Sequence, residues 1–314
     1  MKKTEEILAY RDRDGQEIKI PAVTFTGDSA GPHAVITAGV HGCEYPPIIA
    51  AAEFCRTCKL EDVRGTITVV TISALNSFEK RTPFVCPVDG KNPNRFFPGD
   101  ESGSYTECLT YHLFHDIISK GDYHIDLHCG DMTETLAPFC EFGTGFSVEV
   151  DQKSREIALY SGMPNLVESN FRDGGGDLPE GLGYMNSVRY GIPAAIVEVG
   201  QMGRTDRDYV EGHLFCIRNV LRRFGNLSGQ AVPTATPSWF TTYDSVYAPA
   251  TGIFLRCVEA GEDVVSGQKI GVIEDYFGNP IAEATAHSAG RILYLTSSIA
   301  VQKDGFLLDM VLKS

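Results

Sequence analysis

Residues 33–58 read HAVITAGVHGCEYPPIIAAAEFCRTC, and this stretch decides the fold class. The apolar run at 33–37 predicts a short β-strand, and residues 43–58 predict a helix. Pro46 and Pro47 fit that helix because they fall in its first turn. A strand that leads through a short polar segment into a helix is the repeating unit of an α/β protein.

The same alternation continues to about residue 225. It consists of predicted strands at 66–73, 123–128, 137–142 and 193–199, and predicted helices at 104–119, 152–161, 181–190 and 206–224. Strands separated by helices imply a mostly parallel or mixed sheet with helices on both faces. We therefore expect an α/β domain over residues 1–235.

A second region of different character follows a linker at residues 225–238 (GNLSGQAVPTATPS). It has short β-runs, frequent glycines and a weak internal repeat, with GIFL at 252–255 matched by GRIL at 290–293. We expect a small all-β domain over residues 240–314 that resembles the barrel-sandwich fold of biotinyl and lipoyl domains. Residues 274–289 contain no lysine to carry a prosthetic group, so a structural role or homo-oligomerisation is the expected use.

The composition narrows the classes of partner. The 314 residues carry a formal net charge of −14, which disfavours a nucleic-acid partner because such partners need basic surface. The apolar runs are too short to span a membrane, and the N-terminal MKKTEE turns acidic where a signal peptide would turn apolar. Nine scattered cysteines indicate reduced thiols. We therefore expect a cytoplasmic protein.

Histidine and acidic side chains stand at the ends of the predicted strands. His41 and Glu44 follow the first strand three positions apart, which puts both side chains on one helix face. His128 closes a second predicted strand, and Glu198 lies near the end of a third. Ligand sites in open α/β sheets form at the carboxyl ends of the strands. We therefore expect these four side chains to converge on one rim.

This set matches a hydrolytic zinc site. A catalytic zinc ion takes three protein ligands and leaves its fourth position to water. His41, Glu44 and His128 supply the ligands for one zinc per chain, which leaves Glu198 as a base. Taken singly, each residue also fits a plain structural role. Asp126 shares a strand face with His128, where it either orients that histidine or is an unrelated buried acid.

Further residues give the set a family resemblance. The chain resembles the succinylglutamate desuccinylase/aspartoacylase family, relatives of the zinc carboxypeptidases, from about residue 30 to residue 312. The shared motifs are His41-x-x-Glu44, Asp126-x-His128, Glu198-x-Gly200 and the Asn94-Arg95 pair within residues 92–99 (NPNRFFPG). The resemblance implies a zinc-carboxypeptidase-like mixed sheet flanked by helices. It also implies a deacylase that hydrolyses the amide bond of a small N-acyl amino acid or related compound.

The resemblance also implies roles for these residues. It implies that His41, Glu44 and His128 are the zinc ligands and that Glu198 is the general acid/base. Asn94 and Arg95 match the pair that grips a substrate carboxylate, a task suited to a planar guanidinium. Arg81 is the arginine that we align, in a catalytic role, with one that stabilises the oxyanion. The chain departs from the family pattern at two positions, where Pro93 stands in place of Leu and Cys129 in place of Thr. These differences affect the expected choice of substrate more than the expected chemistry.

Two other functions remain open from the sequence. A zinc carboxypeptidase acting on short peptides would use the same metal chemistry. A metal-stabilised, non-enzymatic binding protein is the alternative from another class, although a structural zinc normally has a fourth protein ligand. The glycines at 174–176 lack the Gly-Lys-Ser/Thr ending of a phosphate loop and indicate a loop that covers the substrate.

Overall fold

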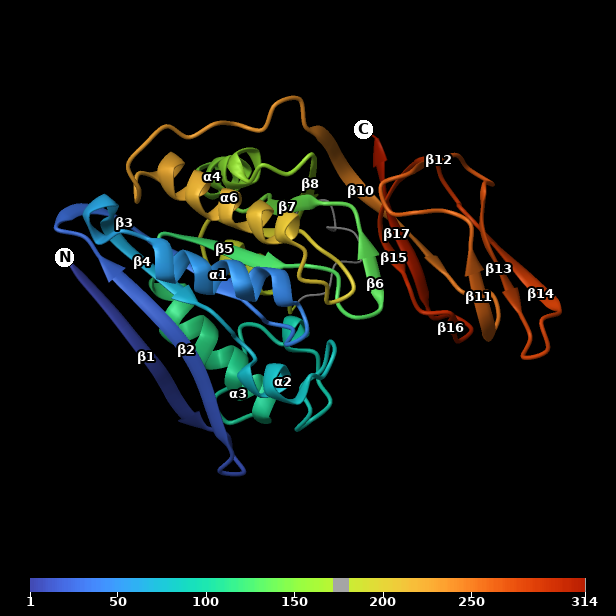
Figure 1. Ribbon diagram of the computed structural model, residues 1–314, viewed down its shortest axis with the longest axis horizontal. Coiled ribbons are helices and arrows are strands. Elements are labelled where there is room, and N and C mark those ends of the chain that lie inside the picture. Colours follow the sequence, from blue (N-terminus) through green and yellow to red (C-terminus); the bar gives the residue numbers. More distant parts are fainter. Residues whose placement is uncertain (172–180, 314) are drawn as a thin grey trace.

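The computed structural model describes residues 1–171 and 181–313 of the chain (Figure 1). The loop predicted at residues 174–176 lies outside this described part. Within it, no helix is both long and apolar enough to cross a lipid bilayer. All nine cysteines are free thiols.

A 13-stranded mixed sheet runs through the molecule (Figure 1). Its strands follow the order β1 (Lys2–Arg11), β2 (Glu17–Thr26), β4 (Arg64–Val70), β3 (Ser29–Ala38), β5 (Tyr123–His128), β9 (Ala194–Glu198), β7 (Phe139–Thr144), β8 (Asn165–Asn170), β10 (Ser238–Tyr247), β17 (Phe306–Lys313), β15 (Gly290–Thr296) and β12 (Asp263–Val264), and β6 (Glu134–Leu136) pairs with β15. The neighbours β3, β5 and β9 are parallel, whereas β7 runs antiparallel to β9. The predicted α/β class is confirmed.

Helices flank the sheet on both faces, as predicted. They are α1 (Tyr45–Thr57), α2 (Leu75–Lys80), α3 (Tyr105–His112), α4 (Val148–Tyr160), α5 (Gly183–Arg189) and α6 (Arg207–Phe224), with short turns η1 (Leu60–Asp62), η2 (Pro93–Arg95), η3 (Leu113–Ile117) and η4 (Ile118–Lys120). On β3, Ala34 and Ile36 pack in one apolar cluster with α1 and α6, whereas Val35 packs in another with α3. This division follows from the two-residue period of a strand.

Several elements differ from the sequence prediction. The helix expected over residues 104–119 is divided, because α3 ends at His112 and continues as the π turn η3 and the 3₁₀ turn η4. The hairpin of β1 and β2 was not predicted, although Ile18 and Ile20 alternate with exposed residues in β2. Strand β8 and helix α2 were also missed.

The C-terminal region continues the large sheet. Strand β10 pairs in parallel with β8 and antiparallel with β17, so the sheet crosses the predicted boundary between domains 1–235 and 240–314. A second, four-stranded antiparallel sheet has the order β14 (Pro280–Thr285), β13 (Lys269–Glu274), β11 (Gly252–Arg256) and β16 (Ala300–Val301). Both sheets contribute to one apolar cluster, in which Phe254 and Ile273 lie with Leu308. The barrel-sandwich assignment stays a prediction.

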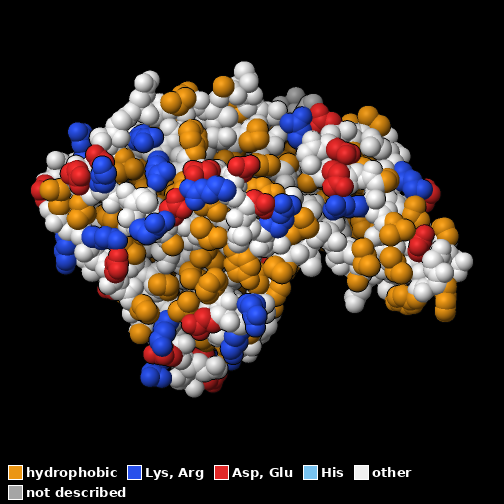
Figure 2. Space-filling view, viewed as in Figure 1, with side chains coloured by type: hydrophobic (Ala, Val, Ile, Leu, Met, Phe, Trp, Pro, Cys, Tyr) orange, Lys and Arg blue, Asp and Glu red, His pale blue; other side chains and the backbone are white. Residues whose placement is uncertain are grey.

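The outer end of the four-stranded sheet is apolar (Figure 2). Tyr276 and Phe277, in the turn between β13 and β14, are 76% and 90% exposed. Elsewhere on the face drawn in Figure 2, Lys and Arg are interspersed with Asp and Glu, and further hydrophobic side chains gather in the lower middle of the view. Homo-oligomerisation through the C-terminal region stays a prediction.

Candidate metal centre

The predicted convergence at one rim is what the fold produces. Strands β3, β5 and β9 are parallel neighbours, and His128 is in register with Glu198 at their carboxyl ends. In a sheet, such neighbouring backbones lie about 4.8 Å apart. His41 follows β3, and Glu44 is the N-cap residue of α1.

The loop between β3 and α1 has a local reason for its sequence. A Cβ atom on Gly42 would lie 2.3 Å from the backbone nitrogen of Phe78, so only glycine fits between His41 and Cys43. Pro46 and Pro47 occupy the first turn of α1, where the missing N–H groups cost no helix hydrogen bond. These constraints hold His41 beside Glu44 before any ligand is considered.

His41, Glu44 and His128 form a compact donor set. Their ligand atoms all lie within 4.8 Å of one another, and each residue is at least 92% buried because their exposed fractions are 8%, 2% and 1%. Glu44 Oε1 lies 2.5 Å from His41 Nδ1, and Glu44 Oε2 lies 3.1 Å from His128 Nδ1. Within the described residues, this is a group able to hold a metal ion.

The charges of this set support one another. Burial alone would raise the pKa of Glu44, but His128 and His41 together lower it. Burial alone would lower the pKa of His128, but Glu44 and Asp126 raise it well above its usual range. A negative carboxylate thus lies between two histidines, and a metal ion bound to the trio would take both histidines in their neutral form and displace their protons.

A hydrogen-bonded chain lies behind His128. Asp126 Oδ1 is 3.4 Å from His128 Nε2 and accepts a hydrogen bond of 2.6 Å from the Thr37 hydroxyl. Thr37 also bonds His124 Nε2 at 2.7 Å, and His124 Nδ1 bonds the Ser187 hydroxyl at 2.9 Å. This arrangement supports the reading of Asp126 as the residue that orients His128.

Glu198 lies beside the trio without belonging to it. Its side chain is 4% exposed, and its Oε2 has no hydrogen-bond partner in the described part of the chain. Burial raises the pKa of Glu198 to about 8, against the lowering effect of His128. A carboxyl group poised near neutral pH can both accept and donate a proton.

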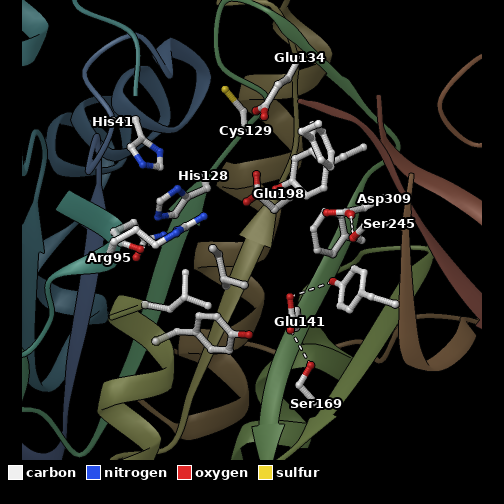
Figure 3. A pocket seen from close by; sticks show the side chains of 18 of the residues that line it. His41, Arg95, His128, Cys129, Glu134, Glu141, Ser169, Glu198, Ser245 and Asp309 are labelled. Atoms are coloured by element: carbon white, nitrogen blue, oxygen red, sulfur yellow. Dashed lines mark hydrogen bonds between the residues drawn. The ribbon is translucent and has the colours of Figure 1, made fainter. Parts of the chain in front are cut away.

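A cavity of about 1190 Å³ opens from the trio, and Asn94 and Arg95 line it (Figure 3). Figure 3 shows the Arg95 side chain beside His128. Asn94 Oδ1 accepts a hydrogen bond of 2.9 Å from the backbone of Gly183, and Arg95 Nη1 donates one of 2.6 Å to the Asn94 carbonyl. The predicted substrate-binding pair is therefore brought to the same cavity as the donor set.

Arg81 is not brought there. It is exposed at the C-terminal end of α2 with a left-handed φ of 55°, and it is not among the residues that line the cavity. Asn92, which the sequence reasoning passed over, accepts a hydrogen bond of 2.9 Å from His41 Nε2. Asn92 stands two residues before Asn94 in the same motif, and this position is the sequence feature that could have indicated a role at the site.

The C-terminal region forms another wall of the cavity, and the sequence reasoning missed it. Tyr243 and Ser245 on β10, Tyr294 on β15 and Asp309 on β17 all line the cavity. Glu134 also lines it, and burial together with the charge of Glu44 raises the pKa of Glu134 to about 7. No motif marks these residues, because strand pairing between distant segments brings them together.

Comparison with known proteins agrees with the fold and identifies the family. Residues 30–224 match the family model for the succinylglutamate desuccinylase/aspartoacylase catalytic domain. A curated relative, the N-alpha-acetyl-L-2,4-diaminobutyric acid deacetylase of Halomonas elongata, is 28% identical over 271 residues, which cover 84% of this chain and 77% of the relative.

Solved structures share the fold over nearly the whole chain. The succinylglutamate desuccinylase/aspartoacylase of Rhodobacter sphaeroides has a TM-score of 0.87 at 22% identity, covering 99% of this chain and 95% of its own. The product-bound ectoine utilization protein EutE (DoeB) of Ruegeria pomeroyi has a TM-score of 0.88 at 22% identity, with the same coverage. At this level of identity the two structures speak for the fold alone.

Proposed function

This chain belongs to the succinylglutamate desuccinylase/aspartoacylase family, and from that premise we propose that it is a zinc-dependent deacylase of small N-acyl amino acids or related N-acyl compounds. The observation that carries the proposal is the register of β5 and β9, which sets Glu198 beside His128 of the buried donor trio. A metal-ligating trio with a separate carboxyl group beside it is the arrangement of a catalytic site.

The donor trio fits a zinc ion by its chemistry. His41, Glu44 and His128 offer two imidazoles and one carboxylate, a set that catalytic zinc takes while keeping a position for water. When bound, zinc acidifies that water and polarises the acyl carbonyl. The Asp126 carboxylate lies 3.4 Å from His128 Nε2, within ion-pair distance, and so favours one orientation of the ring.

Glu198 moves the protons. It accepts a proton as water attacks the acyl carbonyl, and its raised pKa allows it to hold that proton. It then donates the proton to the departing amine nitrogen, which would otherwise be a poor leaving group. Its burial excludes bulk water from this exchange.

Asn94 and Arg95 bind the substrate carboxylate. Arg95 presents its guanidinium in the cavity, and the hydrogen bond from the Gly183 backbone fixes the Asn94 side chain. A bidentate guanidinium–carboxylate contact would set the acyl amide at a fixed distance from the trio.

A substrate panel tests the proposal. The zinc-loaded protein is assayed with N-acetyl and N-succinyl amino acids, including N-acetyl-2,4-diaminobutyrate because the Halomonas relative carries that name, and with short peptides. We expect hydrolysis of the N-acyl amino acids and not of the peptides. Preferential removal of C-terminal residues from peptides would replace the proposal with a carboxypeptidase. Stoichiometric zinc without any hydrolysis would favour a binding protein.

A further inference from the structure

The cavity extends along the sheet beyond the metal centre. Glu198 is in register with Phe139, and Ile196 is in register with Glu141 on the next strand. Side chains two positions apart share a strand face, so Glu141 lies on the same face as Glu198. With about 3.4 Å per residue and about 4.8 Å between strands, their Cα atoms are about 8 Å apart. A substrate seated at the trio can therefore reach Glu141 with a short side chain.

The cavity is lined by many more acidic residues than basic ones. Seven carboxyl residues and only one Lys or Arg, Arg95, line it in the described part of the chain. Glu44 has two histidine partners, but Glu141 and Asp309 have no ion pair among the described residues. We call the part of the cavity around Glu141, Ser169, Tyr243 and Asp309 the acidic arm.

Hydroxyl groups from two strands hold the Glu141 carboxylate in place (Figure 3). The Ser169 hydroxyl donates to Oε1 at 2.6 Å, and the Tyr243 hydroxyl donates to Oε2 at 2.9 Å. A neighbouring Ser245 hydroxyl donates to Asp309 Oδ1 at 2.5 Å. Donated hydrogen bonds favour the charged form of a carboxyl group, yet a buried charge also needs a counter-charge. Within the described residues, the arm supplies hydrogen bonds to these carboxyl groups but no counter-charge.

An unused hydroxyl group points to a ligand as well. Tyr184 lines the cavity, is 1% exposed and adjoins Glu141. Its hydroxyl has no hydrogen-bond partner in the described part of the chain. Buried polar atoms are almost always paired, so an orphaned one in a cavity marks a position for a ligand atom.

We propose that the acidic arm binds a cationic group on the side chain of the substrate, so that the preferred substrate is an N-acyl basic amino acid. The inference rests on the proposed deacylase function. Arg95 takes the α-carboxylate, the acyl amide lies at the trio, and an ammonium group contacts both the Glu141 carboxylate and the adjoining Tyr184 hydroxyl. The Glu141 carboxylate supplies the charge, and Ser169 and Tyr243 position it.

A matched substrate pair tests the proposal in the zinc-loaded protein. N-acetyl-2,4-diaminobutyrate is compared with N-acetylnorvaline, which replaces the ammonium group with a methyl group. Charged hydrogen bonds contribute roughly 1.5–3 kcal/mol, so we expect a preference of about 10- to 100-fold in kcat/KM for the cationic substrate. Equal kcat/KM values would overturn the inference. Absence of hydrolysis for every N-acyl compound would instead contradict the proposed function.

Variants locate the effect. Glu141→Gln should raise KM for the cationic substrate about 10-fold or more and change the neutral substrate by less than about 3-fold. Glu149→Gln, the same change at a side chain 77% exposed on α4, is the control. If Glu141→Gln fails to fold by circular dichroism, Asp309→Asn replaces it with a smaller expected rise in KM. Equal losses for both substrates would overturn the assignment.

Calorimetry adds a readout that does not depend on turnover. Binding of 2,4-diaminobutyrate and of norvaline is measured with the zinc-free protein. We expect tighter binding of the diamine, and loss of that difference in Glu141→Gln. Equal binding of the two amino acids to the native chain would contradict the acidic arm as a cation site.

Discussion

The two ends of the cavity were built in different ways. At the metal centre, His41, Glu44, His128 and Glu198 stand at the carboxyl ends of three parallel neighbours. In the acidic arm, the functional groups stand on the faces of strands that belong to distant segments of the chain. Strand ends can be recognised in a sequence, whereas a strand face becomes a site only through its neighbours. The comparison explains why motifs marked one end and not the other.

The two ends also treat buried charge differently. Glu44 is surrounded by His41 and His128, and these lower its pKa despite burial. Glu141 has only hydroxyl partners, and burial raises its pKa. At the metal centre, two histidines of the protein compensate the charge of the carboxylate. In the acidic arm, we infer that a ligand supplies the counter-charge. The predictions below separate these two designs.

Removal of zinc should have the largest effect. We expect chelation and dialysis to abolish turnover, because the acidified water is lost. Stoichiometric zinc should restore it, as measured by the rate of amine release and by elemental analysis. The diamine should still bind the zinc-free chain, because the acidic arm is independent of the metal. Full turnover in a chain shown to be free of metal would contradict the catalytic role of the metal centre.

Loss of the proton carrier should come next. Glu198→Gln keeps the shape of the side chain but removes its titration, so we expect kcat to fall about 10²- to 10⁴-fold. Zinc content should stay stoichiometric, because Glu198 is separate from the donor trio. The measurement is kcat together with zinc per chain. A variant that loses its zinc would move Glu198 into the ligand set.

The loss of the substrate-binding arginine should cost less. Arg95→Ala removes the guanidinium that faces the trio, so we expect KM to rise about 10- to 100-fold with a smaller change in kcat. Arg95→Lys should recover only part of the affinity, because an ammonium group cannot bind both carboxylate oxygens in one plane. Arg13→Ala, at a side chain 58% exposed, is the control. An unchanged KM would separate Arg95 from the substrate carboxylate.

Much of this molecule was predictable from local pattern. The strand at 33–37 and the helix at 43–58 correspond to β3 and α1, because apolar periodicity and the placement of Pro46 act within a few residues. The pairing of β10 with β8 could not be read in that way. Register between segments about 70 residues apart depends on tertiary packing, which no single window contains.

The site residues also fall into those that local sequence could predict and those that tertiary packing brings together. The spacing of His41 and Glu44 predicted a common ligand through a shared helix face, but both residues lie in the turn before α1, where the Glu44 N–H donates a hydrogen bond of 3.3 Å to the His41 carbonyl. Tyr243 and Asp309 lie in strands that the sequence reasoning placed in a separate domain, yet both line the cavity. The linker composition at 225–238 marked a change of character, although the sheet continues beyond it.

A pH series should detect the uncompensated acids. Burial raises the pKa of Glu134 to about 7, so the folded chain holds a proton that the unfolded chain releases above its ordinary value of about 4.5. Folding then binds a proton between these values, and the free energy of unfolding should fall by about 3 kcal/mol as the pH rises from about 4.5 to 7. Urea unfolding of the zinc-free chain at several pH values measures this.

Glu134→Gln provides the matched comparison for that series. The amide does not titrate, so the fall in stability with pH should be smaller than in the native chain by about 3 kcal/mol. Glu61→Gln, at an exposed position in η1, should leave the pH dependence unchanged. Parallel curves for Glu134→Gln and the native chain would show that Glu134 is solvated rather than buried.

The smallest effect is expected at Arg81. A residue that stabilises the oxyanion typically costs about 10²- to 10³-fold in kcat when it is lost. Arg81 is exposed and stands outside the cavity lining, and substitutions at such positions usually change free energies by no more than about 0.5 kcal/mol. Arg81→Ala should therefore keep kcat within about 3-fold, with Arg81→Lys as its conservative partner. A loss above about 100-fold in Arg81→Ala alone, with the fold intact by circular dichroism, would mean that Arg81 reaches the reacting carbonyl during turnover. The metal centre would then include a catalytic residue that does not stand at a strand end. The difference between the metal centre and the acidic arm would be smaller.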